Sequence, residues 1–156
     1  VITKDTFVLK EMKVQAYRKK LNAHKVHSSQ DVFQYIKKLR EALSHEDYVE
    51  SFYIVVLSRA NNIIGWKRIS VGGTAGTVVD VKLVAKFVLE TVGSGVILIH
   101  NHPSGNLNPS KADVQITKQI QNCFQPFKIP VLDHLIISDD YETNDSYHSF
   151  ADEGML

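Results

Sequence analysis

The sequence lacks the features that mark exported or membrane proteins. Its 156 residues include a single cysteine, Cys123, so an internal disulfide cannot form. No apolar run approaches the roughly 20 residues that cross a bilayer, and no basic segment leads into a short apolar one in the manner of a secretion signal. We therefore expect a cytoplasmic protein that makes no contact with a membrane.

Net charge is also close to zero, at +1, which argues against a strongly electrostatic nucleic-acid binder. The charges are nevertheless uneven along the chain. Residues 1–28 hold seven Lys or Arg and two acids, whereas residues 129–156 hold seven acids and no Lys or Arg. We favour two solvated surfaces that attract each other, and a basic arm that binds nucleic acid stays open as the alternative.

Apolar periodicity in the first half predicts strands around one helix. Residues 7–17 alternate as in a half-buried strand, and Ser28 and Ser29 stand where a helix cap is expected. Behind them, apolar residues recur at helical spacing, at Val32, Phe33, Ile36, Leu39 and Leu43. The runs SFYIVVLS and NIIGWKRISV then predict an antiparallel hairpin. The following glycines, from Gly72, lack the Lys-Ser/Thr of a phosphate loop, so no nucleotide cofactor is predicted.

The second half alternates helix and strand. Asp80 can cap a helix that Gly93 and Gly95 close. The elements predicted from there on are a helix over 80–91, a strand over 96–100, a helix over 110–124 and a strand over 129–138. The order predicts a mixed α/β (α+β) fold, with a central β-sheet and helices packed on its faces.

The chemistry of the sequence is concentrated in VILIHNHPSGNLNPSKAD, residues 96–113. Side chains alternate along a strand, so His100 and His102 project to one face and Asn101 to the other. Pro103 cannot donate to a sheet ladder and is expected to end the strand. Asp113 falls in the first turn of the next helix, where it can face the strand end.

Two imidazoles and one carboxylate suit zinc, and three protein ligands leave a fourth position for water, as in catalytic sites. Zinc makes hydroxide available at neutral pH, and a proton shuttle is then needed. The best placed acid is Glu50, directly before the apolar run SFYIVVLS.

Each of these residues also has a structural explanation. A His-x-His pair on a strand is usually incidental, Ser110 and Asp113 resemble a capping box, and Glu50 can be a solvated strand start. Asp133 and His134 lie on opposite faces of the last predicted strand, so one of them can support the site, and filling of the core is the alternative.

The combination resembles the JAMM (MPN-plus) metalloprotease signature: HNH, seven residues, Ser, two residues and Asp, with an upstream Glu before a strand. The flanking segments resemble the RadC family within that class, namely ESFYIVVL, VILIHNHPSG, NPSKAD, VLDHLIIS and SFADEGML. The resemblance implies a JAMM or cytidine-deaminase-like sandwich over residues 29–156, preceded by a basic N-terminal extension over residues 1–28.

The resemblance implies that His100, His102 and Asp113 ligate Zn²⁺, that Glu50 is the general acid/base, and that Ser110 hydrogen-bonds an oxyanion. It further implies a zinc metallopeptidase that hydrolyses peptide or isopeptide bonds of a peptide or protein substrate. The alternative is a DNA-repair-associated module that binds protein or nucleic acid and keeps the metal for structure. We favour the enzyme, because no Cys or further His stands at a spacing that would close the fourth position.

Two segments depart from the RadC pattern. Residues 78–83 read VVDVKL where RadC chains carry a Pro-Arg-Glu type segment, and no helix-hairpin-helix region is found ahead of the first predicted helix.

Overall fold

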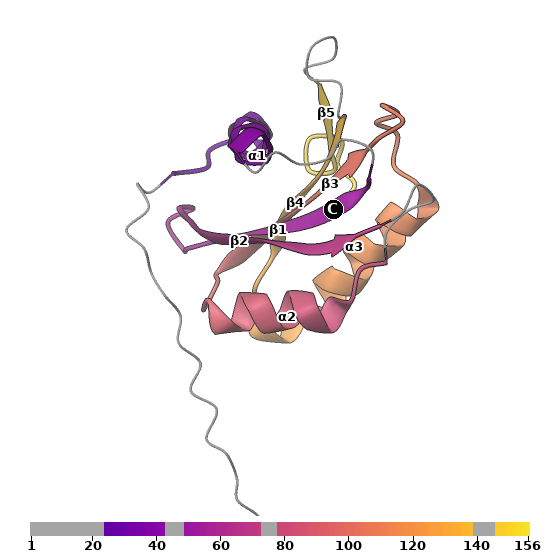
Figure 1. Ribbon diagram of the computed structural model, residues 1–156. Coiled ribbons are helices and arrows are strands. Elements are labelled where there is room, and N and C mark those ends of the chain that lie inside the picture. The colour runs from indigo at the N-terminus through magenta and orange to yellow at the C-terminus, as the bar shows by residue number, and fades with distance from the viewer. Residues whose placement is uncertain (1–23, 43–48, 73–77, 139–145) are drawn as a thin grey trace, which may run out of the picture.

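A five-stranded mixed sheet, in the order β2-β1-β3-β4-β5, forms the centre of the computed structural model (Figure 1). The structure describes residues 24–42, 49–72, 78–138 and 146–156. The strands are β1 Ser51–Leu57, β2 Ile63–Val71, β3 Gly95–His102, β4 Val131–Ser138 and β5 Tyr147–Ser149. The helices are α1 Ser29–Ala42, α2 Val81–Glu90 and α3 Lys111–Phe124, with a 3₁₀ turn over Gln125–Phe127. β3 and β4 are parallel, and all other neighbouring strands are antiparallel.

Helices cover both faces of the sheet, α1 on one side and α2 with α3 on the other (Figure 1). The apolar side chains of α1 pack on one set of alternating strand residues, which includes Tyr53, Val55 and Ile99. Those of α2 and α3 pack on the other set, which includes Phe52, Ile54 and Leu98. Every residue of β1 is buried, as expected for a strand covered on both faces. The predicted fold class is confirmed.

The predicted helix starts are found where capping residues stand. The Ser28 hydroxyl accepts a hydrogen bond from the Asp31 N–H at the start of α1, and the Asp80 carboxylate accepts from the Lys82 N–H at the start of α2. α3 begins after Ser110, as predicted. The hairpin is also confirmed, as β1 and β2.

The end of α2 differs from the prediction that glycines close it. The left-handed residue there is Val92, with φ 53°, and Gly95 already belongs to β3. Gly93 is required for a different reason, because a Cβ at this position would lie 2.2 Å from the Val56 side chain. Its role is therefore close approach of the chain to β1.

Two features fall outside the predictions or outside the described residues. The three-residue strand β5 was not predicted. The predicted strand over residues 7–17 lies outside the described residues, as do most of the N-terminal extension and the glycines at 73 and 76. Among the described residues, no helix combines the length and apolar character that crossing a membrane requires.

Candidate metal centre

The carboxyl end of β3 and the first turn of α3 bring two histidines and one carboxylate together. The Nε2 atoms of His100 and His102 lie 2.8 Å apart. The Asp113 carboxylate lies 3.2 Å from His100 Nε2 and 3.6 Å from His102 Nε2. One ligand atom from each of the three residues lies within 4.8 Å of the others, so together these side chains could hold a metal ion.

The strand and the helix place these residues as the alternation of side chains predicts. His100 and His102 share the face of the sheet that α3 covers, and β3 ends at His102, directly before Pro103. The chain then turns back, and the Gly105 N–H donates to the His102 carbonyl oxygen. Carboxyl ends of parallel strands are the usual location of ligand sites in open sheets.

A capping box at the start of α3 orients the carboxylate. The Ser110 hydroxyl accepts from the Asp113 N–H at 3.1 Å, and Asp113 Oδ2 accepts from the Ser110 N–H at 2.6 Å. The capping interpretation of these two residues and the ligand interpretation of Asp113 are therefore compatible. A hydroxyl that accepts in a cap keeps its own hydrogen, so Ser110 can still donate to a group outside the helix.

The ring of His102 is hydrogen-bonded through Nδ1, on the side away from the candidate ligands. Its Nδ1 lies 2.5 Å from the carbonyl oxygen of Asn106, which can only accept. Nδ1 therefore carries a proton, and in the neutral ring Nε2 is left with its lone pair directed at the centre.

His100 also has a partner behind it. Its Nδ1 lies 2.8 Å from Nε2 of His134, and Nδ1 of His134 lies 2.6 Å from the hydroxyl of Thr117. Of the two residues considered on β4, His134 is therefore the one that supports the site. Asp133 faces the other way, where its carboxylate accepts from the hydroxyl of Ser149.

Sequence reasoning missed Thr117. It stands four residues after Asp113, one helical turn further on the same face of α3. That spacing is the one signal that could have found it.

The charges of the site follow from burial and from these contacts. Burial raises the pKa of Asp113, but its contacts with His100, His102 and Ser110 outweigh this effect and hold the pKa well below its usual range. The hydrogen bond with Asp113 raises the pKa of His102 against the opposing effect of burial. Complete burial lowers the pKa of His134 well below its usual value. The site thus combines an ionised carboxylate with a neutral supporting histidine.

Glu50 directly precedes β1 and is half-buried. Its carboxylate is near enough to the site for its charge to raise the pKa of His102. Asn101 fixes the residues on either side of it, because its side chain accepts from the Ser51 N–H at 2.8 Å and donates to the Val49 carbonyl at 3.0 Å. The backbone oxygen of Glu50 also accepts from the Gly72 N–H.

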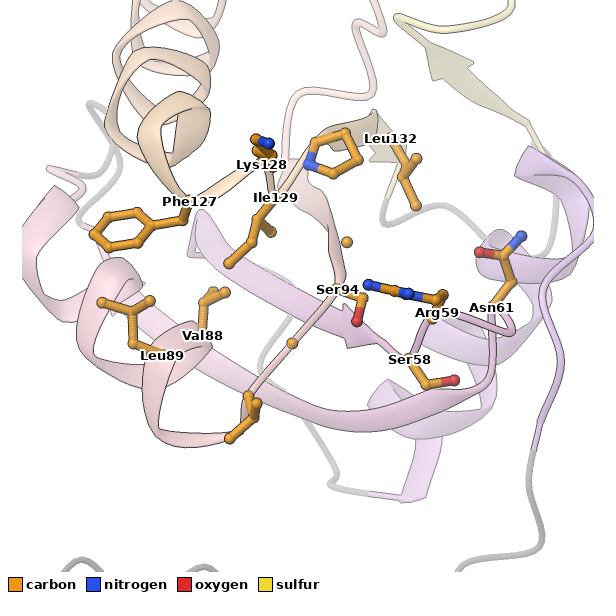
Figure 2. Close-up of a pocket in the computed structure, with 14 residues that line it drawn as sticks. Ser58, Arg59, Asn61, Val88, Leu89, Ser94, Phe127, Lys128, Ile129 and Leu132 are labelled. Carbon is orange, nitrogen blue, oxygen red and sulfur yellow. The ribbon is translucent and has the colours of Figure 1, made fainter.

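A separate cavity of about 560 Å³ lies at the opposite end of the sheet, where α2 ends and β3 begins. Figure 2 shows Val88, Leu89 and Phe127 on one side of it and Arg59 with Asn61 on the other. The charged side chains that line it are both cations, Arg59 and Lys128, and none of the candidate ligands lines it. The cavity is therefore distinct from the candidate metal centre.

Comparisons with known proteins match most of the chain. The family model described as RadC-like JAB domain matches residues 26–155. A UPF0758 protein of Flavobacterium johnsoniae is 44% identical over 136 residues, which are 87% of this chain and 56% of the relative. The UPF0758 protein of Porphyromonas gingivalis is 38% identical over 107 residues, 69% of this chain and 45% of the relative.

A third relative, the UPF0758 protein FN0909 of Fusobacterium nucleatum, is 34% identical over 129 residues, 83% of this chain and 52% of the relative. The chain thus spans about half the length of the curated relatives it matches. The names of these relatives state no activity.

Proposed function

Because the chain belongs to the RadC-like JAB domain family, we propose that it is a zinc-dependent hydrolase that acts on peptide or isopeptide bonds. Zinc is proposed because imidazole nitrogens and one carboxylate oxygen are ligands that this metal accepts at tetrahedral sites.

The observation that carries the proposal is the convergence of the two Nε2 atoms beside an ionised carboxylate. They lie 2.8 Å apart, and the Nδ1 atom of each ring is hydrogen-bonded on the far side, to His134 and to Asn106. Two lone pairs at this separation repel each other unless a cation or a proton lies between them. The donor set therefore fits a divalent metal, and histidine ligands are typically held from behind in this way.

The number of ligands supports a catalytic site over a structural one. In the described parts of the chain, the cluster that could hold a metal has three members, and a structural zinc site normally has four protein ligands. The fourth position is then available to water and substrate.

The residues around the metal supply the remaining chemistry. Zinc, when bound, would polarise a water molecule and so supply a nucleophile at neutral pH. The Glu50 carboxylate would accept the proton of that water and deliver it to the leaving amine. The Ser110 hydroxyl would donate a hydrogen bond to the oxyanion that develops on the substrate carbonyl.

Metal analysis tests the first half of the proposal. Protein purified without a chelator or a His tag is expected to contain close to one zinc per chain, and the double variant His100→Ala/His102→Ala is expected to contain none. Wild-type protein that stays metal-free after addition of zinc would overturn the proposal.

Peptidase activity needs a test that does not presuppose the substrate. We would incubate the zinc-loaded protein with a denatured bacterial proteome and quantify newly formed amino groups by mass spectrometry. The signal is expected for wild type and not for Glu50→Gln.

A nucleic-acid-associated role is the second candidate, supported by the seven Lys or Arg among residues 1–28. Binding through phosphates weakens steeply as salt increases. A gel-shift titration at two salt concentrations would test it, and no binding to single- or double-stranded DNA at low salt would exclude it.

A further inference from the structure

A buried chain of hydrogen bonds links two of the candidate ligands through residues that are not ligands themselves. It runs from Nδ1 of His100 to Nε2 of His134 at 2.8 Å, and from Nδ1 of His134 to the Thr117 hydroxyl at 2.6 Å. The same hydroxyl lies 2.6 Å from the carbonyl oxygen of Asp113. His134 is 0% exposed and Thr117 2%, so bulk water does not compete for these bonds.

The proton on the Thr117 hydroxyl sets the direction of the chain. This hydroxyl has one hydrogen, and the Asp113 carbonyl can only accept. The hydrogen therefore points at Asp113, and the Thr117 oxygen must accept from Nδ1 of His134.

The next proton follows from the burial of His134. A charged imidazolium would be costly there, because the ring is completely buried and is flanked by the rings of Phe52 and Phe150. Above the ordinary histidine pKa both rings are neutral, and with Nδ1 protonated the Nε2 of His134 is an acceptor. The 2.8 Å contact then requires His100 to donate from Nδ1, and the neutral ring of His100 keeps its lone pair on Nε2.

The chain also joins three elements of the fold. His100 is on β3, His134 on β4 and Thr117 on α3. The Thr117 hydroxyl donates a hydrogen bond to the backbone carbonyl of Asp113. The position of one ligand is thus coupled to that of another through the interior of the protein.

We propose that His134 and Thr117 are positioning residues that hold His100 in the tautomer with its proton on Nδ1, so that Nε2 is presented to the metal. The role toward the metal rests on the proposed function, whereas the position of the proton can be measured without any metal.

The test is the tautomer of His100 in the metal-free protein, observed through its ring nitrogens by ¹⁵N NMR at mildly alkaline pH. Wild type is expected to show a protonated Nδ1 and an unprotonated Nε2. Thr117→Val keeps the shape of the side chain but removes the acceptor for His134, so the preference of His100 is expected to be lost. The matched control Thr117→Ser keeps the hydroxyl and is expected to keep the wild-type pattern.

Zinc affinity is the second readout, measured by competition with a chromophoric chelator. Thr117→Val and His134→Gln are expected to bind zinc about 10- to 100-fold more weakly, the usual effect of losing a group that holds a metal ligand. Thr117→Ser is expected to retain the wild-type affinity. A role limited to packing would weaken the fold without moving the His100 nitrogens.

The outcomes separate the two proposals. A proton on Nε2 of His100 in wild type would overturn the positioning role even if zinc is bound, and the wild-type spectrum decides this whether or not the variants fold. If wild type shows the expected tautomer but never takes up zinc, the positioning role is supported. Only the proposed hydrolase function is then contradicted.

Discussion

Single side chains around the centre have separable tasks in the proposed function. Glu50 would carry the proton, Asp113 would supply a charged ligand, and Ser110, which caps α3, would also contact the oxyanion. Substitutions that preserve shape can therefore distinguish chemistry from metal binding.

Glu50→Gln keeps the size of the side chain but cannot accept a proton, so turnover is expected to fall by about 10² to 10⁴ while zinc is retained. Asp113→Asn removes a charged ligand, so zinc affinity itself is expected to drop. Zinc content and turnover of the two variants are compared in parallel. Loss of zinc from Glu50→Gln as readily as from Asp113→Asn would make Glu50 a fourth ligand and the site a structural one.

Ser110→Ala is expected to retain zinc but to lose activity, by roughly 3 kcal/mol of transition-state stabilisation if the hydroxyl contacts the oxyanion. It also removes the acceptor for the Asp113 N–H, which is expected to cost about 1 kcal/mol of folding stability. Kinetics and urea unfolding measure the two effects. Ser110→Thr, which keeps a hydroxyl, is the control, and full activity of Ser110→Ala would remove Ser110 from the mechanism.

Among the elements, β3 serves both faces of the sheet at once. Its two histidines face α3, while Asn101 between them faces the other way and bonds to the backbone of Val49 and Ser51. The segment that carries Glu50 and the two candidate histidine ligands are therefore connected through a single strand.

Asn101→Ala is expected to destabilise the fold by about 1 to 3 kcal/mol, because it leaves buried backbone groups without their partner. It is also expected to lower turnover, since the backbone on both sides of Glu50 loses its anchor, while the zinc content stays at the wild-type level. Urea unfolding, metal analysis and kinetics measure the three quantities. Unchanged turnover would show that Glu50 is held by other contacts.

Sequence alone predicts the elements with strong local signals. β1 and β3 are long apolar runs, α2 and α3 begin at capping residues, and His100 with His102 share a face because of the strand period. β5 has three residues, too few for a period, and exists because it pairs with β4. Contacts that depend on strand pairing could not be predicted from the sequence either. The parallel pairing of β3 with β4 brings His134 next to His100, and no local sequence signal indicates which strands pair.

At the scale of the whole molecule, we expect the free energy of unfolding to depend on pH, and we expect the direction of this dependence to differ between the metal-free and the zinc-loaded protein. The pKa of His102 is raised in the folded protein, chiefly by its hydrogen bond with Asp113. In the metal-free protein, the folded state therefore holds more protons than the unfolded state above the ordinary histidine value of 6.5. The contribution of His102 to stability is therefore expected to be complete below that pH and to be lost as the pH rises through the raised pKa. Buried His134, whose pKa is lowered, acts only on the acid side of the ordinary histidine value.

Bound zinc is expected to reverse this slope, since it displaces protons from its ligands and binds more tightly at higher pH. Urea unfolding on either side of the ordinary histidine pKa, with chelated and with zinc-loaded protein, measures both slopes. His102→Gln is expected to flatten the metal-free slope. Equal slopes with and without zinc would show that the metal does not bind His102.

The arrangement of the centre along the chain has a consequence for how the proposed activity would be lost. The three candidate ligands lie between positions 100 and 113, on one strand and the helix that follows it, whereas Glu50 directly precedes β1, a strand distant in the sequence that pairs with β3. Local opening of a protein usually releases one such unit before the rest. Under the proposed function, fraying at the start of β1 would withdraw Glu50 and leave the three candidate ligands assembled, so the protein would bind metal without turning over substrate.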